Sequence, residues 1–198
     1  IKHMKKHQIL VHFKFMAAIV LLSLSIIACK EEEVDDPNIT YVKINKSITS
    51  PLNRNAVSDT IDVNADGVDD FRMFAVSTAA ADTSLTYLYG SNALFYIDST
   101  QTYSDTYKAK NLFKGEQPEL MSTKTQWYFY AFTGAKTVPS SRGYAGVGDV
   151  FIPFMFLVGV NKHYGWMSIN VSSDYRTFKI IDAAFHLTPD TPIKMGAK

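Results

Sequence analysis

The stretch that decides the fold is VFIPFMFLVGV, residues 150–160, which is almost wholly apolar. Its eleven residues are too few for a membrane-spanning helix, which needs about 20, and Pro153 and Gly159 interrupt it. A short apolar run of this kind is typical of a core strand that is covered on both faces. Residues 164–171 then alternate between apolar and polar side chains, and Thr177–Leu187 is expected to be the last strand. These segments predict the centre of a β-sheet.

Shorter strand signals precede this centre. They occupy Ile39–Asn45, Thr60–Val63, Phe71–Ser77, Leu85–Tyr89, Ala93–Ile97 and Trp127–Phe132. Gly90, Ser91 and Asn92 suit a hairpin loop between two of them. No segment of twelve or more residues has the apolar period of a helix, although Tyr103–Lys124 is compatible with a long loop or one short helix. The pattern predicts an all-β protein, an antiparallel, jelly-roll-like β-sandwich over residues 39–198.

The composition is that of a folded chain without a strongly charged surface. The 198 residues are 46% hydrophobic and 13% aromatic, which is too apolar for a disordered chain. The 20 Lys and Arg side chains balance 19 Asp and Glu, so we expect no nucleic-acid partner. The single cysteine excludes an intramolecular disulfide.

The first 28 residues have the organisation of a signal peptide. Lys5, Lys6 and Lys14 form a basic region, and Phe15–Ala28 is an uncharged, mostly apolar stretch that is short for a membrane helix. It ends in the sequence IIAC, which resembles a bacterial lipobox. The resemblance implies that Cys29 becomes the lipidated N-terminus and that the membrane is a partner through this lipid. The alternative is a buried N-terminal helix with a stray cysteine.

Residues 29–38, CKEEEVDDPN, are expected to form a solvated acidic tether. Lys30 followed by acids, directly after the lipid cysteine, resembles the surface-export signal of some Gram-negative lipoproteins. No Asp follows Cys29, where it would resemble an inner-membrane retention signal. These resemblances imply an outer-membrane lipoprotein that is exposed at the cell surface. The alternative is an anchor that faces the periplasm.

An Asp-rich loop, DVNADGVDD at residues 62–70, is the strongest candidate for chemistry. Oxygen-bearing side chains stand at its positions 1, 3, 5 and 9, and Gly67 at position 6 permits a sharp turn. Ca²⁺ takes six to eight oxygen ligands, and alternate residues of a tight loop can supply them. The sequence therefore predicts a calcium site. Its expected ligands are Asp62, Asn64, Asp66, the carbonyl of Val68, and Asp70 with Asp69 as its substitute.

The loop resembles the Asp-rich calcium loops of secreted bacterial β proteins. It departs from the EF-hand, because position 12 is Met73 where a bidentate Glu is required. The alternative is an Asx-rich hairpin turn without a metal. Repulsion among Asp66, Asp69 and Asp70 favours the ion.

A wider family resemblance follows from this loop together with KHYGWMSI at residues 162–169, IIDAAF at 180–185 and PIKMG at 192–196. The combination resembles a family of secreted or anchored bacterial all-β proteins with an Asp-rich hairpin and a Tyr-Gly-Trp strand. The resemblance spans roughly Asp59–Gly196. It implies architecture and location, and no catalytic role.

The remaining candidates are interpreted as structural. His163 and His186 lack the spacing of a metal site or a catalytic triad. Four aromatic residues are expected to be core or sheet-face side chains rather than sugar-stacking platforms: Trp166, Trp127, Tyr128 and Tyr130. Glu116 and Glu119 are close in sequence, which is poor evidence for paired catalytic carboxylates.

The sequence thus favours a non-enzymatic, lipid-anchored binding or structural module. A glycan or a surface protein is the expected partner. The alternative is a hydrolase that acts on extracellular polymers such as glycans, which requires a cleft with converging carboxylates.

Overall fold

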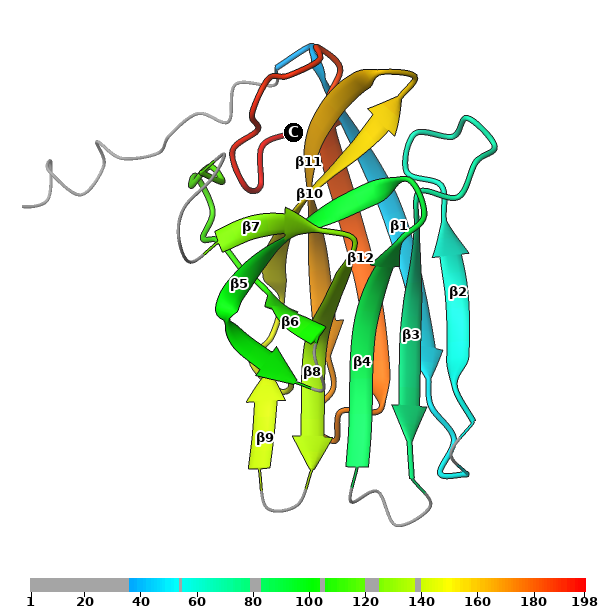
Figure 1. Cartoon of the computed structure of the whole chain (residues 1–198). Coiled ribbons are helices and arrows are strands. Elements are labelled where there is room, and N and C mark those ends of the chain that lie inside the picture. The colour runs from blue at the N-terminus through cyan, green and yellow to red at the C-terminus, as the bar shows by residue number, and fades with distance from the viewer. Residues whose placement is uncertain (1–35, 54, 79–82, 104–105, 120–124, 138–139) are drawn as a thin grey trace, which may run out of the picture. The chain divides into compact units, whose positions relative to one another are not determined.

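The computed structural model describes residues 36–53, 55–78, 83–103, 106–119, 125–137 and 140–198 (Figure 1). The chain divides into two compact units, residues 1–34 and 35–198. The expected signal peptide and Cys29 lie outside the described residues, as does most of the tether. The description below concerns the second unit.

The described part of this unit is all-β, as the sequence predicts, and contains no helix. Its twelve strands are β1 (Ile39–Thr49), β2 (Val57–Ile61), β3 (Phe71–Ser77), β4 (Thr83–Gly90), β5 (Ala93–Tyr103), β6 (Thr106–Ala109), β7 (Thr125–Tyr128), β8 (Tyr130–Thr137), β9 (Ser140–Gly143), β10 (Val150–Val158), β11 (Asn161–Val171) and β12 (Thr177–His186). Within the described ranges, no helix is long and apolar enough to cross a membrane.

All twelve strands belong to one sheet. Its order is β1-β12-β11-β10-β5-β6-β8-β4-β3-β2, with β7 paired to β5 and β9 to β8. The pairings are antiparallel, as expected, with the exception of β6 and β8, which run parallel. Strand β5 joins the two halves, because residues 93–95 pair with β10 and later residues pair with β6. Strand β5 is therefore the point at which the sheet passes from one half to the other.

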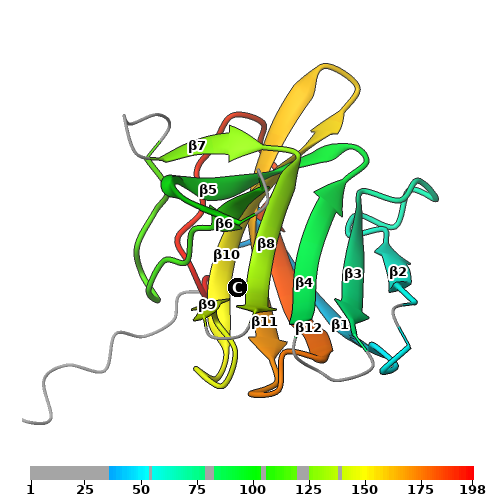
Figure 2. The same cartoon turned by 60° about the horizontal axis from the view of Figure 1, so that its bottom comes forward.

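The two halves of the sheet face each other across the main core. Figure 2 shows β8, β4 and β3 in front of β11, β12 and β1. Phe71 of β3 meets Phe95 of β5 and Phe154 of β10, with ring centroids 5.9 and 5.6 Å apart. These three rings are fully buried, so they hold the two layers together at the centre of the core.

Strand β10 is covered on both faces over most of its length, as its sequence predicts. Ile152, Phe154 and Phe156 point into the main core. Phe151 and Met155 pack on the opposite side, in a second apolar cluster built around Trp166 and the C-terminal segment. The apolar run was expected to be buried to Val160, and this is wrong for its last residues. The strand ends at Val158, and the exposed turn that follows leads into β11.

Several expected strands differ in their limits. The first runs to Thr49, and the strand from Ala93 continues to Tyr103. The expected strand Trp127–Phe132 is two strands, β7 and β8, separated at Phe129. In the described part of Tyr103–Lys124, β6 and a loop replace the short helix that the sequence left open, and residues 120–124 lie outside the described residues.

Candidate functional site

The Asp-rich loop connects β2 to β3 and is held by its own side chains. The Asp62 carboxylate accepts hydrogen bonds from the amides of Asp66 (3.2 Å) and Gly67 (2.8 Å). Asn64 Oδ1 accepts from the amide of Asp66 at 3.0 Å, and Asp66 Oδ1 accepts from the amide of Val68 at 2.8 Å. Gly67 has a φ of 88°, in the region that favours glycine. The loop is therefore a series of Asx turns, with Asp62, Asn64 and Asp66 gathered around one tight bend.

Asp70 closes the loop from inside the protein. Its side chain is fully buried, and Oδ2 accepts a hydrogen bond from the amide of Val63 at 2.8 Å. Oδ1 is also buried and has no hydrogen-bond partner in the described part of the chain. The pKa of Asp70 is raised to about 6, chiefly by burial and in part by the neighbouring charges of Asp66 and Asp62, against the opposing backbone hydrogen bonds from Val63 and Asn64. A buried carboxylate oxygen without a donor is costly, and a cation would compensate for it.

The other expected ligands lie on the outside of the loop. The side chains of Val68 and Asp69 are exposed. Within the described ranges, no three acidic, histidine or cysteine side chains form a group that could hold a metal. Side-chain hydrogen bonds thus bring Asp62, Asn64 and Asp66 to one bend, whereas Asp70 is buried at the base of the loop on the amide of Val63, and Asp69 is exposed.

The main chain of Asp70 connects this loop to the next turn and to β10. Its carbonyl accepts hydrogen bonds from the amides of Ser91 (2.9 Å) and Asn92 (3.0 Å) in the β4–β5 turn. The Asn92 carbonyl in turn accepts from the amide of Leu157 at 3.2 Å, and Asn92 Nδ2 donates to the Leu157 carbonyl at 2.7 Å. The Asp-rich loop, the β4–β5 turn and the end of β10 therefore form one hydrogen-bonded edge.

A pocket of about 480 Å³ lies along this edge. Its walls include Phe129, Leu94, Met155, Leu157 and Lys162, together with the turn at residues 90–93. Most of these groups are apolar, and Lys162 is the one charged residue among the lining residues.

A second surface feature is a row of aromatic side chains on the outward face of β3, β4 and β8 and at the junction between β7 and β8. The row consists of Phe74, Tyr87, Tyr130, Tyr89 and Phe129. The rings of Phe74 and Tyr87 stack at 4.6 Å with an interplanar angle of 10°, and Tyr87 is 4.9 Å from Tyr130. Tyr89 meets Phe129 edge-on at 6.0 Å. We call this set the aromatic row.

The aromatic row is open to solvent at its end and backed by the sheet. Tyr89 is 40% exposed and Phe129 is 44% exposed, whereas the other three rings are half-buried. Burial and a side-chain hydrogen bond with Tyr87 raise the pKa of Tyr130, so its hydroxyl stays protonated. The exposed Arg72 lies over the Phe74 ring at 5.9 Å. The row thus combines apolar ring faces with hydroxyl and guanidinium donors.

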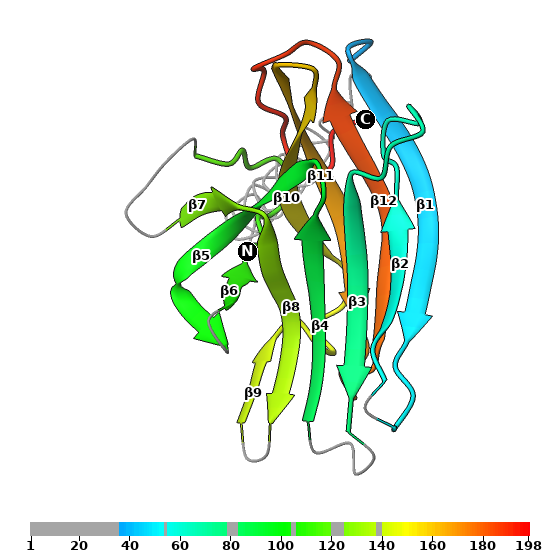
Figure 3. The same ribbon diagram turned by 45° about the vertical axis from the view of Figure 1, so that its right-hand side comes forward.

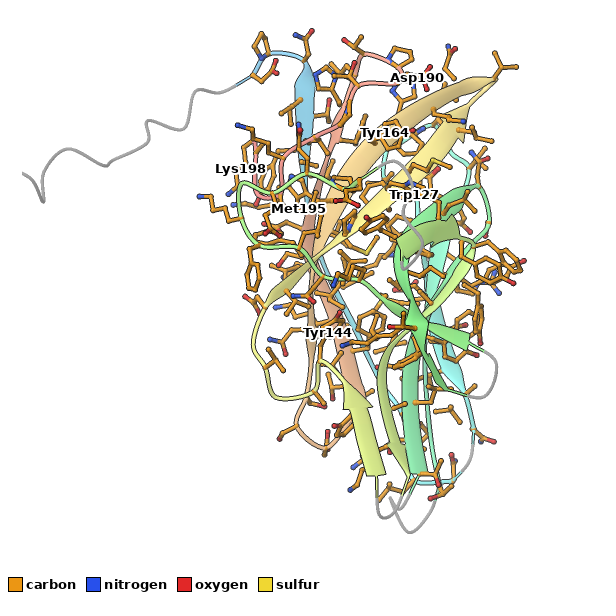
Figure 4. The ribbon with its side chains drawn as sticks, turned by 60° about the vertical axis from the view of Figure 1, so that its left-hand side comes forward. Trp127, Tyr144, Tyr164, Asp190, Met195 and Lys198 are labelled. Carbon is orange, nitrogen blue, oxygen red and sulfur yellow. The ribbon has the colours of Figure 1, made fainter. Side chains whose placement is uncertain are left out.

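Both tryptophans pack in the second apolar cluster, but the indole N–H of one of them lacks a hydrogen-bond partner among the described residues. Trp166 is buried, as expected, and Nε1 donates to the carbonyl of Ala197 at 3.1 Å. Figure 4 shows Trp127 below Tyr164, and their ring centroids are 5.6 Å apart. Trp127 Nε1 is buried without a hydrogen-bond partner among the residues that the structure describes. Burial and the nearby Asp190 charge raise the pKa of Tyr164.

The two histidines lie close together on neighbouring strands. His163 Nδ1 is 3.0 Å from the main-chain oxygen of His186, and its ring stacks on Phe156 at 5.6 Å. His186 Nδ1 accepts from the amide of Thr188 at 3.0 Å, and Nε2 is 3.8 Å from Asp36. Both rings are buried and are used in packing and main-chain contacts.

The two glutamates that could have served hydrolysis lie in the loop after β6. Glu116 and Glu119 are both exposed. Glu116 Oε2 accepts a hydrogen bond from the amide of Phe113 at 2.9 Å, which closes a local turn. Neither carboxylate lines the pocket described above.

Comparison of the chain with protein-family profiles, with curated proteins and with solved structures gives no significant match. The fold and the surface features define an all-β domain with an Asp-rich loop and an exposed aromatic row. The lipoprotein and Tyr-Gly-Trp resemblances remain predictions.

Proposed function

We propose that this protein is a non-enzymatic, lipid-anchored carbohydrate-binding module at the outer surface of a bacterium. The observation that carries the proposal is the aromatic row, in which four rings on an outward sheet face and the adjoining ring of Phe129 contact one another in sequence. The C–H edges of a pyranose ring are apolar and slightly positive, and they are attracted to the negative face of an aromatic ring. A sugar chain lying on the row would also meet the Tyr130 hydroxyl and Arg72.

The row is better suited to an extended glycan than to a single sugar. Four of its members come from the adjacent strands β3, β4 and β8, and Phe129 lies between β7 and β8, so the rings continue across the sheet rather than around a closed pit. The hydroxyl and guanidinium groups lie beside the rings and would bind the polar edges of the sugars. A polysaccharide that uses two or more rings at once gains affinity through multivalency.

Attachment to the membrane is proposed through acylation of Cys29. The basic N-terminal region, the apolar stretch and the sequence IIAC support it. The Lys and acids after Cys29 support an outer-membrane lipoprotein facing the medium, with a periplasm-facing anchor as the alternative. Surface display would bring the aromatic row into contact with extracellular polysaccharide.

The Asp-rich loop is proposed to bind Ca²⁺ and to stabilise the fold. Its support is the unpartnered Oδ1 of buried Asp70, beside the charges of Asp62 and Asp66. A carboxylate oxygen has two lone pairs, so the amide hydrogen bonds leave acceptor capacity for an ion. A weak extracellular site, with Kd on the order of 10⁻⁴–10⁻³ M, would add roughly 0.4–1.4 kcal/mol in millimolar calcium. We expect a rise of a few degrees in melting temperature with calcium over EDTA, lost in Asp66→Ala.

A hydrolase receives less support from the same geometry. Glu116 and Glu119 are exposed in a surface loop rather than paired across a cleft. Glycoside hydrolysis requires two carboxylates held about 5–9 Å apart around the scissile bond. The proposed function is therefore binding.

Affinity electrophoresis of the compact unit, residues 35–198, against a panel of soluble plant and bacterial polysaccharides tests the proposal. Both apolar clusters lie within this unit. We expect at least one polysaccharide to retard it, and the double variant Tyr89→Ala/Phe129→Ala to weaken binding at least about tenfold, or 1.4 kcal/mol. Phe113→Ala, which removes an exposed ring outside the row, is the matched control. Equal retardation of both variants would refute the assignment of the row.

A further inference from the structure

The hairpin between β10 and β11 ends in an unusually apolar tip. Leu157, Val158, Gly159 and Val160 follow one another there, and Val160 is 93% exposed. Leu157 and Val158 are 40% and 44% exposed. Gly159 has a φ of 64°, so the tight turn directs the flanking side chains outward. We call these four residues the hairpin tip. A hairpin turn normally carries polar residues. An exposed apolar tip therefore indicates contact with an apolar partner rather than with water.

The hairpin tip lies at the end of the domain from which the tether leaves. Ile39, the first residue of β1, pairs with His186, and the amide of Leu187 donates to the carbonyl of Asn38 at 2.6 Å. His186 in turn contacts His163, near the start of β11. Figures 1 and 3 both show the start of β1 and the β10–β11 hairpin at the same end of the unit.

The strand register shows how far the β10–β11 hairpin continues at this end of the unit. Gly165 of β11 pairs with Phe185, which pairs with Thr40, so Tyr164 stands level with Ile39. Val160 is four residues further along, which corresponds to about 13 Å at the rise of a strand. The hairpin therefore continues beyond its last pairing with β12, and its tip lies at the same end of the unit as the exit point of the tether (Figures 1 and 3).

The length of the tether keeps this end of the domain close to the lipid. Seven residue steps separate Cys29 from Asp36, the first described residue. A chain spans at most about 3.3–3.6 Å per residue, so Asp36 lies within about 25 Å of an acylated Cys29. An exposed apolar tip at this end, on so short a tether, is well placed to meet the bilayer surface.

We propose that the hairpin tip docks on the lipid bilayer to which the protein is anchored, an inference that rests on the proposed acylation of Cys29. Leu157, Val158 and Val160 enter the boundary between headgroups and acyl chains, as apolar side chains do in interfacial segments. Lys162 is exposed on the adjoining part of β11, and its ammonium reaches the lipid phosphates while its stem lies along the apolar surface.

Docking of the hairpin tip sets the orientation of the domain. The affinity for the membrane comes mainly from the acyl anchor. The strands of the domain would then stand across the membrane plane, because the tip is the end of two long strands. The aromatic row, on an outward sheet face, would be held beside the membrane surface and open to the medium.

Fluorescence quenching in vesicles tests this orientation. Acylation uses the only cysteine of the chain, so Val160→Cys provides a single free thiol for an environment-sensitive label. Ser173→Cys, exposed in the β11–β12 turn at the opposite end of β11, is the matched control. The full acylated chain is reconstituted into phosphatidylcholine vesicles that contain a nitroxide-labelled lipid. We expect at least about threefold more quenching at position 160 than at 173, and a loss of this difference when Leu157→Ser and Val158→Ser are added. Equal quenching at the two positions would overturn the inference.

A second arm separates failure of the docking from failure of the anchor. Mass spectrometry of the N-terminal peptide reports acylation of Cys29 directly. The compact unit 35–198 with an N-terminal hexahistidine tag, held on nickel-chelating lipid, repeats the two labels without any acyl chain. Quenching at 160 in this arm supports docking even if Cys29 is unmodified. A label at 160 that is shielded from aqueous iodide, yet not quenched by lipid nitroxide, would show that the tip contacts protein, and would also overturn the inference.

Discussion

Replacement of Asp70 by Asn tests the energetics of the Asp-rich loop most sharply. Burial raises the pKa of Asp70 from 3.8 to about 6. One pKa unit corresponds to 1.36 kcal/mol, so the folded protein binds the Asp70 proton more tightly than the unfolded chain by about 3 kcal/mol. The folded state therefore carries more protons between about pH 4 and pH 6. In calcium-free buffer, the free energy of unfolding falls as the pH rises through this window, by up to about 3 kcal/mol, and then levels off.

The Asp70→Asn variant has no ionisable side chain at this position, so its free energy of unfolding should not fall as the pH rises from 4 to 6. Its side-chain oxygen can still accept the hydrogen bond from Val63, and its neutral amide is not repelled by Asp62 and Asp66. We expect the variant to be more stable than the wild type in EDTA at pH 7, and to gain little from calcium. The wild type should recover stability when millimolar calcium is added at pH 7, because the ion neutralises the buried carboxylate.

Urea denaturation in EDTA between pH 4.5 and 7.5 measures the effect. Asp69→Asn is the control, because Asp69 lies in the same loop and is exposed. Asp174, whose hydrogen bond with Ser172 lowers its pKa, contributes the opposite slope, but it is common to all three proteins and cancels in the comparison. A wild-type profile that stays flat from pH 4.5 to 7.5, or one that the Asp70→Asn variant reproduces, would refute the reasoning.

Three other changes test the remaining structure. A Cβ added at Gly90 would lie 1.7 Å from the carbonyl oxygen of Ala93, so Gly90→Ala should destabilise the β4–β5 turn by about 2 kcal/mol or more in urea denaturation. Tyr144→Phe removes a hydroxyl that donates to the carbonyl of Ala109 at 2.6 Å, and should cost about 1–3 kcal/mol in the same assay. Cys29→Ser should leave the precursor uncleaved or release the protein from membranes; a processed, acylated species in the detergent phase would contradict this.

The central strands could be predicted because their signals are local. The alternation of apolar and polar residues in 164–171, and the apolar run before it, depend only on neighbours in sequence. The exposure of the hairpin tip could not be predicted in the same way. Hydropathy indicates that residues 157–160 prefer to leave water, but it does not show whether a second layer covers them. In the structure Gly159, with a φ of 64°, lies in the turn between β10 and β11, although the sequence pattern assigns it to the core strand.

The loop spacing could indicate that Asp62, Asn64 and Asp66 gather at one bend, because these contacts span five residues or fewer. The burial of Asp70 depends on packing that the loop sequence does not contain. Asp69 and Asp70 are adjacent in sequence, yet one is exposed and the other fully buried. In a strand or its extension, successive side chains point to opposite sides, and only the assembled sheet decides which side is the core.

The aromatic row escaped prediction because its members come from three strands. Phe74, Tyr87 and Tyr130 are separated by many residues and meet only through the β3–β4 and β4–β8 registers. A partial signal was present: Tyr87 and Tyr89 occupy the positions around buried Leu88 where an exposed strand face would carry polar residues. Aromatic side chains at the outward-facing positions of a strand therefore indicate a candidate binding surface.

The measurement that tests the central claim most directly is an NMR titration of the aromatic-ring signals of the compact unit. The ligand is an oligosaccharide fragment of whichever polysaccharide retards the unit most strongly in electrophoresis. Binding at the aromatic row predicts saturable shifts in the ring signals of Tyr89, Phe129 and Tyr130, while the exposed ring of Phe113 stays unchanged. Saturable binding that leaves the three row signals in place, or a panel in which no polysaccharide retards the unit, would contradict the account.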